Sequence, residues 1–203
     1  MGTTLEQGSI GDAVLRKEDR KLLLGNGRFV DDIHVPGELH AVFVRSPHAH
    51  AGISSIDVSA ASSLPGIVGI LTGADMEADG IGSIPFMWII NNSDGSPMNQ
   101  PKRWGLARDR VRHVGEPVAV VIGDTAAAAA DAADAVLVDY APRPAVIDSR
   151  AALGPGAPLL HDDAPGNEIY TFGRGNADAA TAAIEGAAHV IELDIVNNRI
   201  ACA

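Results

Sequence analysis

The chain has 203 residues, a formal net charge of −11, and 46% apolar but only 4% aromatic residues. This length can bury the core of one domain, or of one domain with arms. The acidic charge argues against nucleic acid, because its phosphates would be repelled. No apolar run approaches the roughly 20 residues that cross a bilayer, and the N-terminus lacks the basic and apolar regions of a secretory signal. We therefore expect a cytoplasmic protein with neither a membrane nor a nucleic acid as partner.

Cysteine content limits the redox centres that the chain can hold. The only cysteine is Cys202. A disulfide framework, a Cys₄ zinc site and an iron–sulfur cluster each need more thiolates than this. An iron–sulfur cluster would therefore have to belong to another polypeptide.

Hydrophobic patterning predicts an irregular, glycine-punctuated arm over residues 1–32, with one exposed helical turn in the charged block 16–21, and then a series of short elements. Asp124 or Thr125 can cap the last helix of this series. Strands are expected at 38–45, 53–58, 67–72, 110–114, 118–122 and 136–140, with helices at 59–64 and 125–135.

The order of these elements predicts a βαβ-like unit over 118–140, and a second strand–helix–strand over 53–72. Between 73 and 105 the pattern dissolves into a long loop, of the kind that is functional or bound to a partner. A proline- and glycine-rich linker follows at 142–158. The sequence then predicts a helix at 177–188 and a strand at 189–196, which would leave an open, association-prone edge. The last residues show no cap, turn or polar tail, so we expect a cut end.

The segment 45–51 carries two histidines, a serine and an arginine. On a strand, His48 and His50 would lie on one face, and two imidazoles placed in this way could supply half of the ligands of a metal site. No further ligand has the spacing to complete it, so we favour a structural role in which these histidines and Arg45 hydrogen-bond backbone or a partner. Ser46 lacks the G-x-S-x-G elbow and an acid to orient a base, so a hydrolase is the weakest interpretation.

Two further features invite a chemical interpretation. Glu116, between Gly115 and Pro117, could be a general base if it were buried beside a substrate, but a tight turn is favoured. The lone G-x-G pairs at 25–27, 80–82 and 173–175 complete no dinucleotide motif and are expected to be turns. A basic run is more typical of a solvated loop or a protein interface than of a surface that binds the phosphates of a nucleic acid. The run comprises Lys102, Arg103, Arg108, Arg110 and Arg112.

Six ordered motifs nevertheless resemble a known family. They are Arg16-x-Glu-Asp-x-x-Leu-Leu-Leu-Gly-x-Gly-Arg-Phe-Val-Asp-Asp32, Gly37-Glu-Leu-His40, 45–51, Leu64-Pro-Gly-Ile-Val68, Val111-Arg-His-Val-Gly-Glu-Pro-Val-Ala-Val-Val121 and Val138-Asp-Tyr140. Together they are similar to the start of the large subunit of the xanthine dehydrogenase, aldehyde oxidase and carbon monoxide dehydrogenase family. The resemblance covers essentially the whole chain.

The resemblance implies an α+β fold. It would consist of an arm (1–36), a hammerhead-type mixed α/β domain (37–150), and a linker with the truncated start of a molybdopterin-binding domain (151–203). The family oxidises aldehydes, N-heteroaromatic compounds or carbon monoxide. It uses molybdopterin, in bacteria often as the cytosine dinucleotide, with [2Fe-2S] clusters and FAD on other chains or domains.

In that family the catalytic and cofactor-binding residues lie beyond the hammerhead domain, so we assign no catalytic, cofactor-binding or metal-binding residue to this chain. Glu116 belongs to the hammerhead motif. We expect the chain to be a truncated fragment or a separately encoded part of a split subunit, inactive alone. Its partners would be the remaining molybdenum-domain polypeptide, the iron–sulfur subunit and the FAD subunit. The alternative is a stand-alone assembly or binding module. The possible interface comprises Arg45, Ser46, His48, His50, Glu116 and the basic run.

Overall fold

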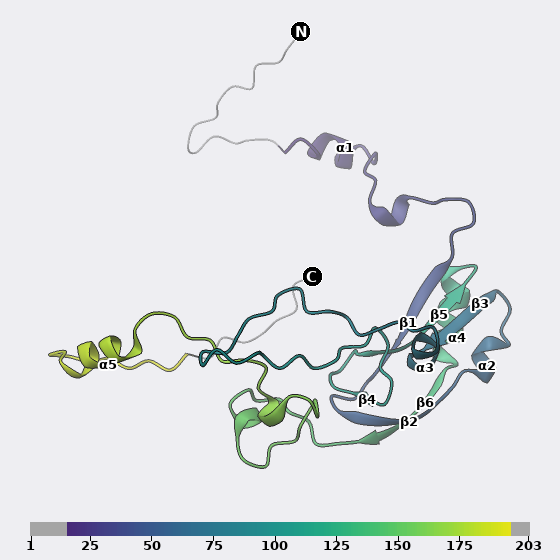
Figure 1. Ribbon diagram of the computed structural model, residues 1–203. Coiled ribbons are helices and arrows are strands. Elements are labelled where there is room, and N and C mark those ends of the chain that lie inside the picture. Colours follow the sequence, from purple (N-terminus) through teal and green to yellow (C-terminus); the bar gives the residue numbers. More distant parts are fainter. Residues whose placement is uncertain (1–15, 196–203) are drawn as a thin grey trace, which may run out of the picture. The chain divides into compact units, whose positions relative to one another are not determined.

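A computed structural model describes residues 16–195 (Figure 1). The chain divides into two compact units. The first is formed by Met1–Val44, Asp57–Ile70 and Val120–Leu137, and the second by Arg45–Ile56, Leu71–Ala119 and Val138–Ala203. Each unit is organised around one small three-stranded sheet.

The first sheet has the order β1-β5-β3. Its central strand β5 (Pro117–Gly123) has only buried and half-buried residues, as expected of a strand covered on both faces. The outer strands are β1 (His40–Arg45) and β3 (Ile67–Thr72). In the first unit, helix α2 (Ser59–Ser62) packs against helix α4 (Ala126–Asp134). The side chains of Ala61, Val121, Ala129 and Ala132 are fully buried.

The second sheet has the order β4-β2-β6. Strand β2 (Ala51–Asp57) pairs antiparallel with β4 (Arg110–Val111), with Ala51 opposite Val111. Strand β6 (Leu137–Pro142) lies on the other side of β2. Ala51 and Val111 are fully buried and form part of the core of this unit.

The remaining elements are short. Helix α1 (Asp19–Leu23) and the 3₁₀ helix η1 (Val30–Asp32) precede the first sheet and bury no residue. After β6 come η2 (Ala151–Leu153), η3 (Pro165–Asn167) and α5 (Ala177–Glu185). No helix within residues 16–195 is long and apolar enough to cross a membrane.

The predicted strands and helices between 38 and 140 are confirmed, with ends shifted by a few residues, but the predicted βαβ-like unit is wrong. Strands β5 and β6 belong to different sheets, as do β2 and β3. The order of elements along a chain shows that a helix connects two strands, but it does not show with which strand each of them pairs. The deeply buried β5 lies at the centre of one sheet, whereas the largely exposed β6 lies at an edge of the other.

Two further predictions need correction. The region 73–105 is not irregular throughout, because helix α3 (Gly73–Ala78) begins it. The Asp75 carboxylate accepts a hydrogen bond from the Thr72 backbone N–H at 2.7 Å and so fixes the start of α3. The predicted strand at 189–196 is also absent over its described part, 189–195, where the apolar side chains are exposed and no strand is paired.

Candidate functional site

The turn at Gly115–Pro117 is hydrogen-bonded to the end of β1. The Ser46 backbone N–H donates to the Glu116 carbonyl at 2.9 Å, and the Gly115 N–H donates to the Ser46 carbonyl at 2.8 Å. The Arg45 guanidinium adds a hydrogen bond to the Gly115 carbonyl at 2.8 Å. Gly115 has a φ of 85°, which favours glycine over other residues. The turn favoured by the sequence is therefore present and joins two of the recognised motifs.

Residues 46–50 form a turn between β1 and β2, so His48 and His50 do not lie on a strand as the metal interpretation assumed. The Ser46 hydroxyl, almost fully buried, accepts from the His48 N–H at 3.0 Å. The His48 ring packs edge-on against Tyr140, with 4.9 Å between ring centroids. Burial raises the pKa of the Tyr140 phenol, opposed by a hydrogen bond with Ser46. These contacts hold the side chains of Ser46 and His48 against neighbouring groups of the second unit.

His50 is the more deeply buried of the two histidines, at 5% exposure. Its Nδ1 lies 2.8 Å from the Pro144 carbonyl oxygen, which can only accept, so Nδ1 is the donor. Its Nε2 is buried without a hydrogen-bond partner among the described residues. The contact connects the turn after β1 to the segment after β6, where the Arg143 N–H also donates to the His50 carbonyl at 2.9 Å.

Three arginines of the basic run are largely buried, so the solvated-loop interpretation is wrong for them, whereas Lys102 and Arg103 are exposed. Side-chain exposures are 17% for Arg108, 10% for Arg110 and 14% for Arg112. Arg108 lies 3.4 Å over the Trp104 ring and 2.9 Å from the Glu77 carboxylate. These arginines use their long side chains to connect neighbouring segments.

Arg112 connects the segment before the turn at Gly115–Pro117 to a distant part of the second unit. Its Nε donates to the Leu160 carbonyl at 2.9 Å and its Nη1 to the Arg110 carbonyl at 3.0 Å. Its backbone N–H donates to the Glu116 carboxylate. Glu116 is half-buried, and its carboxylate already accepts a hydrogen bond from a peptide N–H.

A hollow of about 310 Å³ lies beside this network. It brings together four predicted site residues, namely Lys102, Arg103, Arg112 and Glu116. The remaining lining residues are Ile84, Trp104, Gly105, His113, Pro117 and His161. Arg45, Ser46, His48, His50, Arg108 and Arg110 do not line it.

His161 is a member of this site that the sequence did not reveal. Burial lowers the pKa of its imidazole, and the positive charge of Arg112 lowers it further. Asp163 and Glu116 act in the opposite direction, while Arg110 adds to the decrease. His161 and Asp162 follow the proline-rich segment without a motif, and only the tertiary fold brings them to the basic run.

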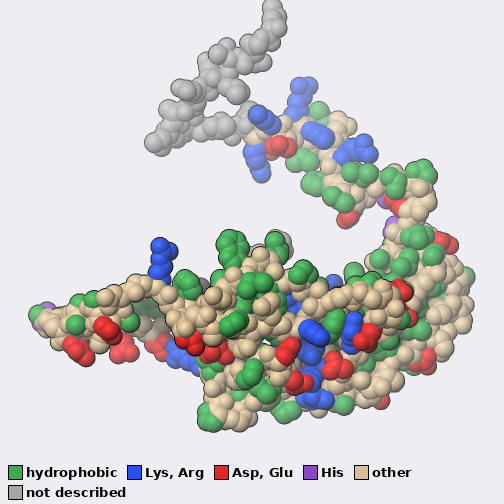
Figure 2. Space-filling view, in the orientation of Figure 1, with side chains coloured by type: hydrophobic (Ala, Val, Ile, Leu, Met, Phe, Trp, Pro, Cys, Tyr) green, Lys and Arg blue, Asp and Glu red, His purple; other side chains and the backbone are tan. Residues whose placement is uncertain are grey.

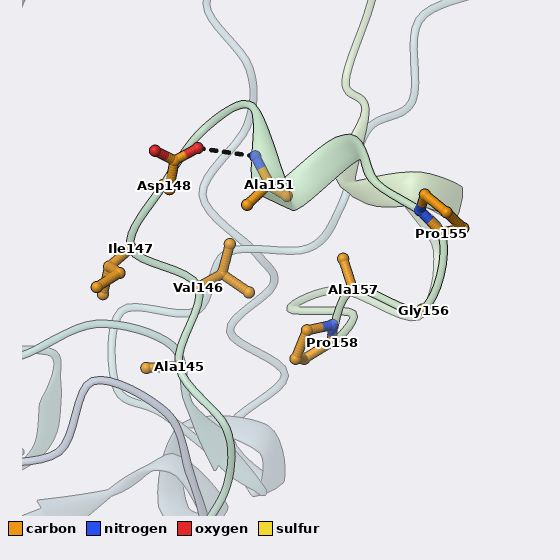
Figure 3. A pocket seen from close by; sticks show the side chains of 10 residues that line it. Ala145, Val146, Ile147, Asp148, Ala151, Pro155, Gly156, Ala157 and Pro158 are labelled. Atoms are coloured by element: carbon orange, nitrogen blue, oxygen red, sulfur yellow. Dashed lines mark hydrogen bonds between the residues drawn. The ribbon is translucent and has the colours of Figure 1, made fainter.

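A second hollow, of about 340 Å³, is formed by residues 145–158 (Figure 3). Its wall is mostly apolar, and Asp148 is its one titratable residue. The Asp148 carboxylate accepts from the N–H groups of Ala151 at 2.7 Å and Arg150 at 2.9 Å, which lower its pKa. The carboxylate therefore caps the start of η2, and this hollow offers no group for chemistry.

Within residues 16–195, no three His, Cys, Asp or Glu side chains are placed to hold a metal ion. Cys202 lies outside the described residues. The fold and site thus define a mixed α/β domain whose polar side chains, in the described part, hold turns and segments together. The chain belongs to the family described as aldehyde oxidase and xanthine dehydrogenase, a/b hammerhead domain, whose model matches residues 24–144.

Known relatives agree with this assignment. The chain is 39% identical over 194 residues to the nicotine 6-hydroxylase large subunit of Paenarthrobacter nicotinovorans, covering 96% of this chain and 23% of that protein. It is also 39% identical over 148 residues to the carbon monoxide dehydrogenase large chain of Afipia carboxidovorans, covering 73% of this chain and 17% of the other. Among solved structures, a Cu,Mo-CO dehydrogenase matches with a TM-score of 0.72 and 33% identity, over 88% of this chain and 23% of that one. The chain therefore spans about a quarter or less of the length of these relatives.

Proposed function

We propose that this chain is the hammerhead portion of the large subunit of a molybdenum-dependent oxidoreductase that acts on aldehydes, N-heteroaromatic compounds or carbon monoxide. In this proposal residues 37–150 are the hammerhead domain, 1–36 an arm, and 151–203 a linker and the start of the molybdopterin-binding domain. The observation that carries the proposal is the family match over 24–144, together with the likeness to a solved Cu,Mo enzyme.

Neither of the two hollows described above fits a molybdopterin cofactor. An extended pterin dinucleotide needs donors and acceptors along its length. One hollow is mostly apolar, with a single carboxylate that is already engaged, and the other has a volume of only about 310 Å³. We therefore assign molybdopterin, as the cytosine dinucleotide, to the rest of the enzyme. We assign the [2Fe-2S] clusters and FAD to partner chains, since one cysteine cannot hold such a cluster.

Exposed apolar side chains support a role in assembly. Met87 is 99% exposed, Trp88 82% and Phe172 70%. The segments that carry them are held side by side, because the Ser93 N–H donates to the Thr171 carbonyl at 3.1 Å. Hydrophobic side chains are frequent on the face drawn in Figure 2. Contiguous exposed apolar patches are typical of surfaces that contact other polypeptides.

The test is co-purification of the tagged chain from the cells that produce it. We expect a larger molybdenum-bearing polypeptide together with flavin and iron–sulfur subunits. The double variant Met87→Ser with Trp88→Ser should reduce this recovery, because it removes exposed apolar area. The matched control Leu137→Ser, on exposed strand β6, should leave recovery unchanged. Recovery of the wild-type chain with none of these partners would contradict the proposal and favour the alternative, a stand-alone binding or assembly module.

A further inference from the structure

The hollow between Trp104 and His161 has an excess of positive charge. Lys102, Arg103 and Arg112 line it, against the single carboxylate of Glu116. That carboxylate already accepts the Arg112 backbone N–H. The chain as a whole carries a net charge of −11, so this concentration of cations runs against the general charge of the protein.

Two of these cations, Lys102 and Arg103, are exposed and lack a charged partner in the part of the chain that the structure describes. Within residues 16–195, neither Lys102 nor Arg103 forms an ion pair, whereas Arg108, Arg110 and Arg112 each lie within 4 Å of a carboxylate. Like charges on residues that line one small hollow repel each other, and a bound anion relieves that repulsion. The missing counter-charge is the first indication of a ligand.

Neighbouring groups hold the unpaired cations in place. The Arg103 guanidinium stacks over the Phe86 ring at 4.8 Å and donates to the Pro85 carbonyl at 3.3 Å. The Lys102 ammonium lies 5.8 Å from the centre of the Trp104 ring. A guanidinium has five N–H donors and an ammonium three, so donors remain free for an oxyanion.

We propose that this hollow binds a small oxyanion of the phosphate or carboxylate class, held by Lys102, Arg103 and Arg112. Its volume of about 310 Å³ lies at the lower end of the range for ligand pockets. The imidazole of His161 also lines the hollow, and an imidazole N–H can donate to an oxyanion. This inference concerns the residues of this chain alone and does not depend on the proposed role in a molybdenum enzyme.

Trp104 provides the measurement. The chain has two tryptophans, so Trp88→Phe leaves Trp104 as the only one, at the wall of the hollow. The full chain carrying this substitution is titrated with inorganic phosphate and, separately, with citrate. Sodium chloride at matched ionic strength corrects for screening. We expect a saturable change in Trp104 emission with at least one of the two anions and none with chloride.

Lys102→Gln with Arg103→Gln should weaken this binding about tenfold or more, because two charge-assisted contacts are lost. Lys17→Gln with Arg20→Gln changes the charge equally at exposed positions in and beside α1 and should leave the affinity unchanged. Circular dichroism checks the fold, and the single variant Lys102→Glu gives a second test if the double variant unfolds. No saturable response to either anion, or an equal loss in both double variants, would overturn the proposal. So would binding of an acidic peptide where both small anions fail.

Discussion

Asp162, at the surface, forms a forked ion pair with the buried guanidinium of Arg110 on β4. The two contacts measure 2.8 Å and 3.3 Å, and the Arg110 side chain is 10% exposed. The pair connects the short strand β4 to a segment 52 residues further along the chain. It therefore links the second sheet to the region that follows η2.

Asp162→Asn should lower the free energy of unfolding at neutral pH, because the buried guanidinium loses its anionic partner. Arg110 holds the pKa of the Asp162 carboxyl below its ordinary value of 3.8. The contribution of this pair is therefore fully present above 3.8 and is lost as the pH falls through the lower, folded-state pKa. Urea unfolding measured across this pH range should show that the free energies of unfolding of the wild-type and variant chains converge at acidic pH. Asp163→Asn is the control, and an effect as large as that of Asp162→Asn would contradict the role of the pair.

Gly73→Ala should destabilise the second unit. A Cβ at Gly73 would lie 2.5 Å from the Ala107 carbonyl oxygen and 3.0 Å from the Arg108 Cα, and both are backbone atoms that cannot easily move. We expect the free energy of unfolding to fall by about 1–3 kcal/mol, as for other overpacked sites. Gly69→Ala, where nothing lies within 4 Å, should leave it unchanged or slightly raised. Urea unfolding of both variants decides whether the close approach at Gly73 matters.

Thr125 is the N-cap of α4. Its hydroxyl accepts from the Ala128 N–H at 3.1 Å, which satisfies one of the free donors of the first turn. Thr125→Ala should therefore lower the free energy of unfolding by about 1 kcal/mol, while Thr125→Ser should retain most of it. Thermal unfolding followed by circular dichroism measures both, and equal melting temperatures for the two variants would show that the cap contributes nothing.

His161 should titrate below its ordinary pKa of 6.5, through burial first and the charge of Arg112 second. Because the unfolded chain then binds the proton more readily, this group makes the fold less stable as the pH falls through 6.5 towards the lower, folded-state pKa. Glu116→Gln removes an anion that raises this pKa and should lower it further. Proton NMR of the imidazole follows the titration, and a pKa above 6.5 in the wild-type chain would contradict the burial.

Local patterns predicted the elements better than their pairing. The alternating segment 38–45, the run 67–72 and the Thr125 cap each depend on neighbours in sequence, and each is present. The division of β5 and β6 between two sheets depends on contacts between distant segments, which no local pattern records.

The same distinction applies to the candidate site. The turn at Gly115 could be anticipated from the conformational freedom of glycine and the fixed φ of the following proline. The approach of His161 and Asp162 to the basic run could not, since 48 residues separate Leu160 from the Arg112 side chain that holds it. The burial of Arg110 was likewise hidden, because a run of basic residues is usually solvated.

We propose that this chain is part of a molybdenum-dependent enzyme but does not itself hold the cofactor. The most direct test is the molar ratio of molybdenum to this chain, measured by mass spectrometry in the purified complex and again after the chain is separated from its partners. We predict about one molybdenum per chain in the complex and none on the separated, folded chain. Stoichiometric molybdenum that stays with the separated chain, or a complex without molybdenum, would contradict the claim.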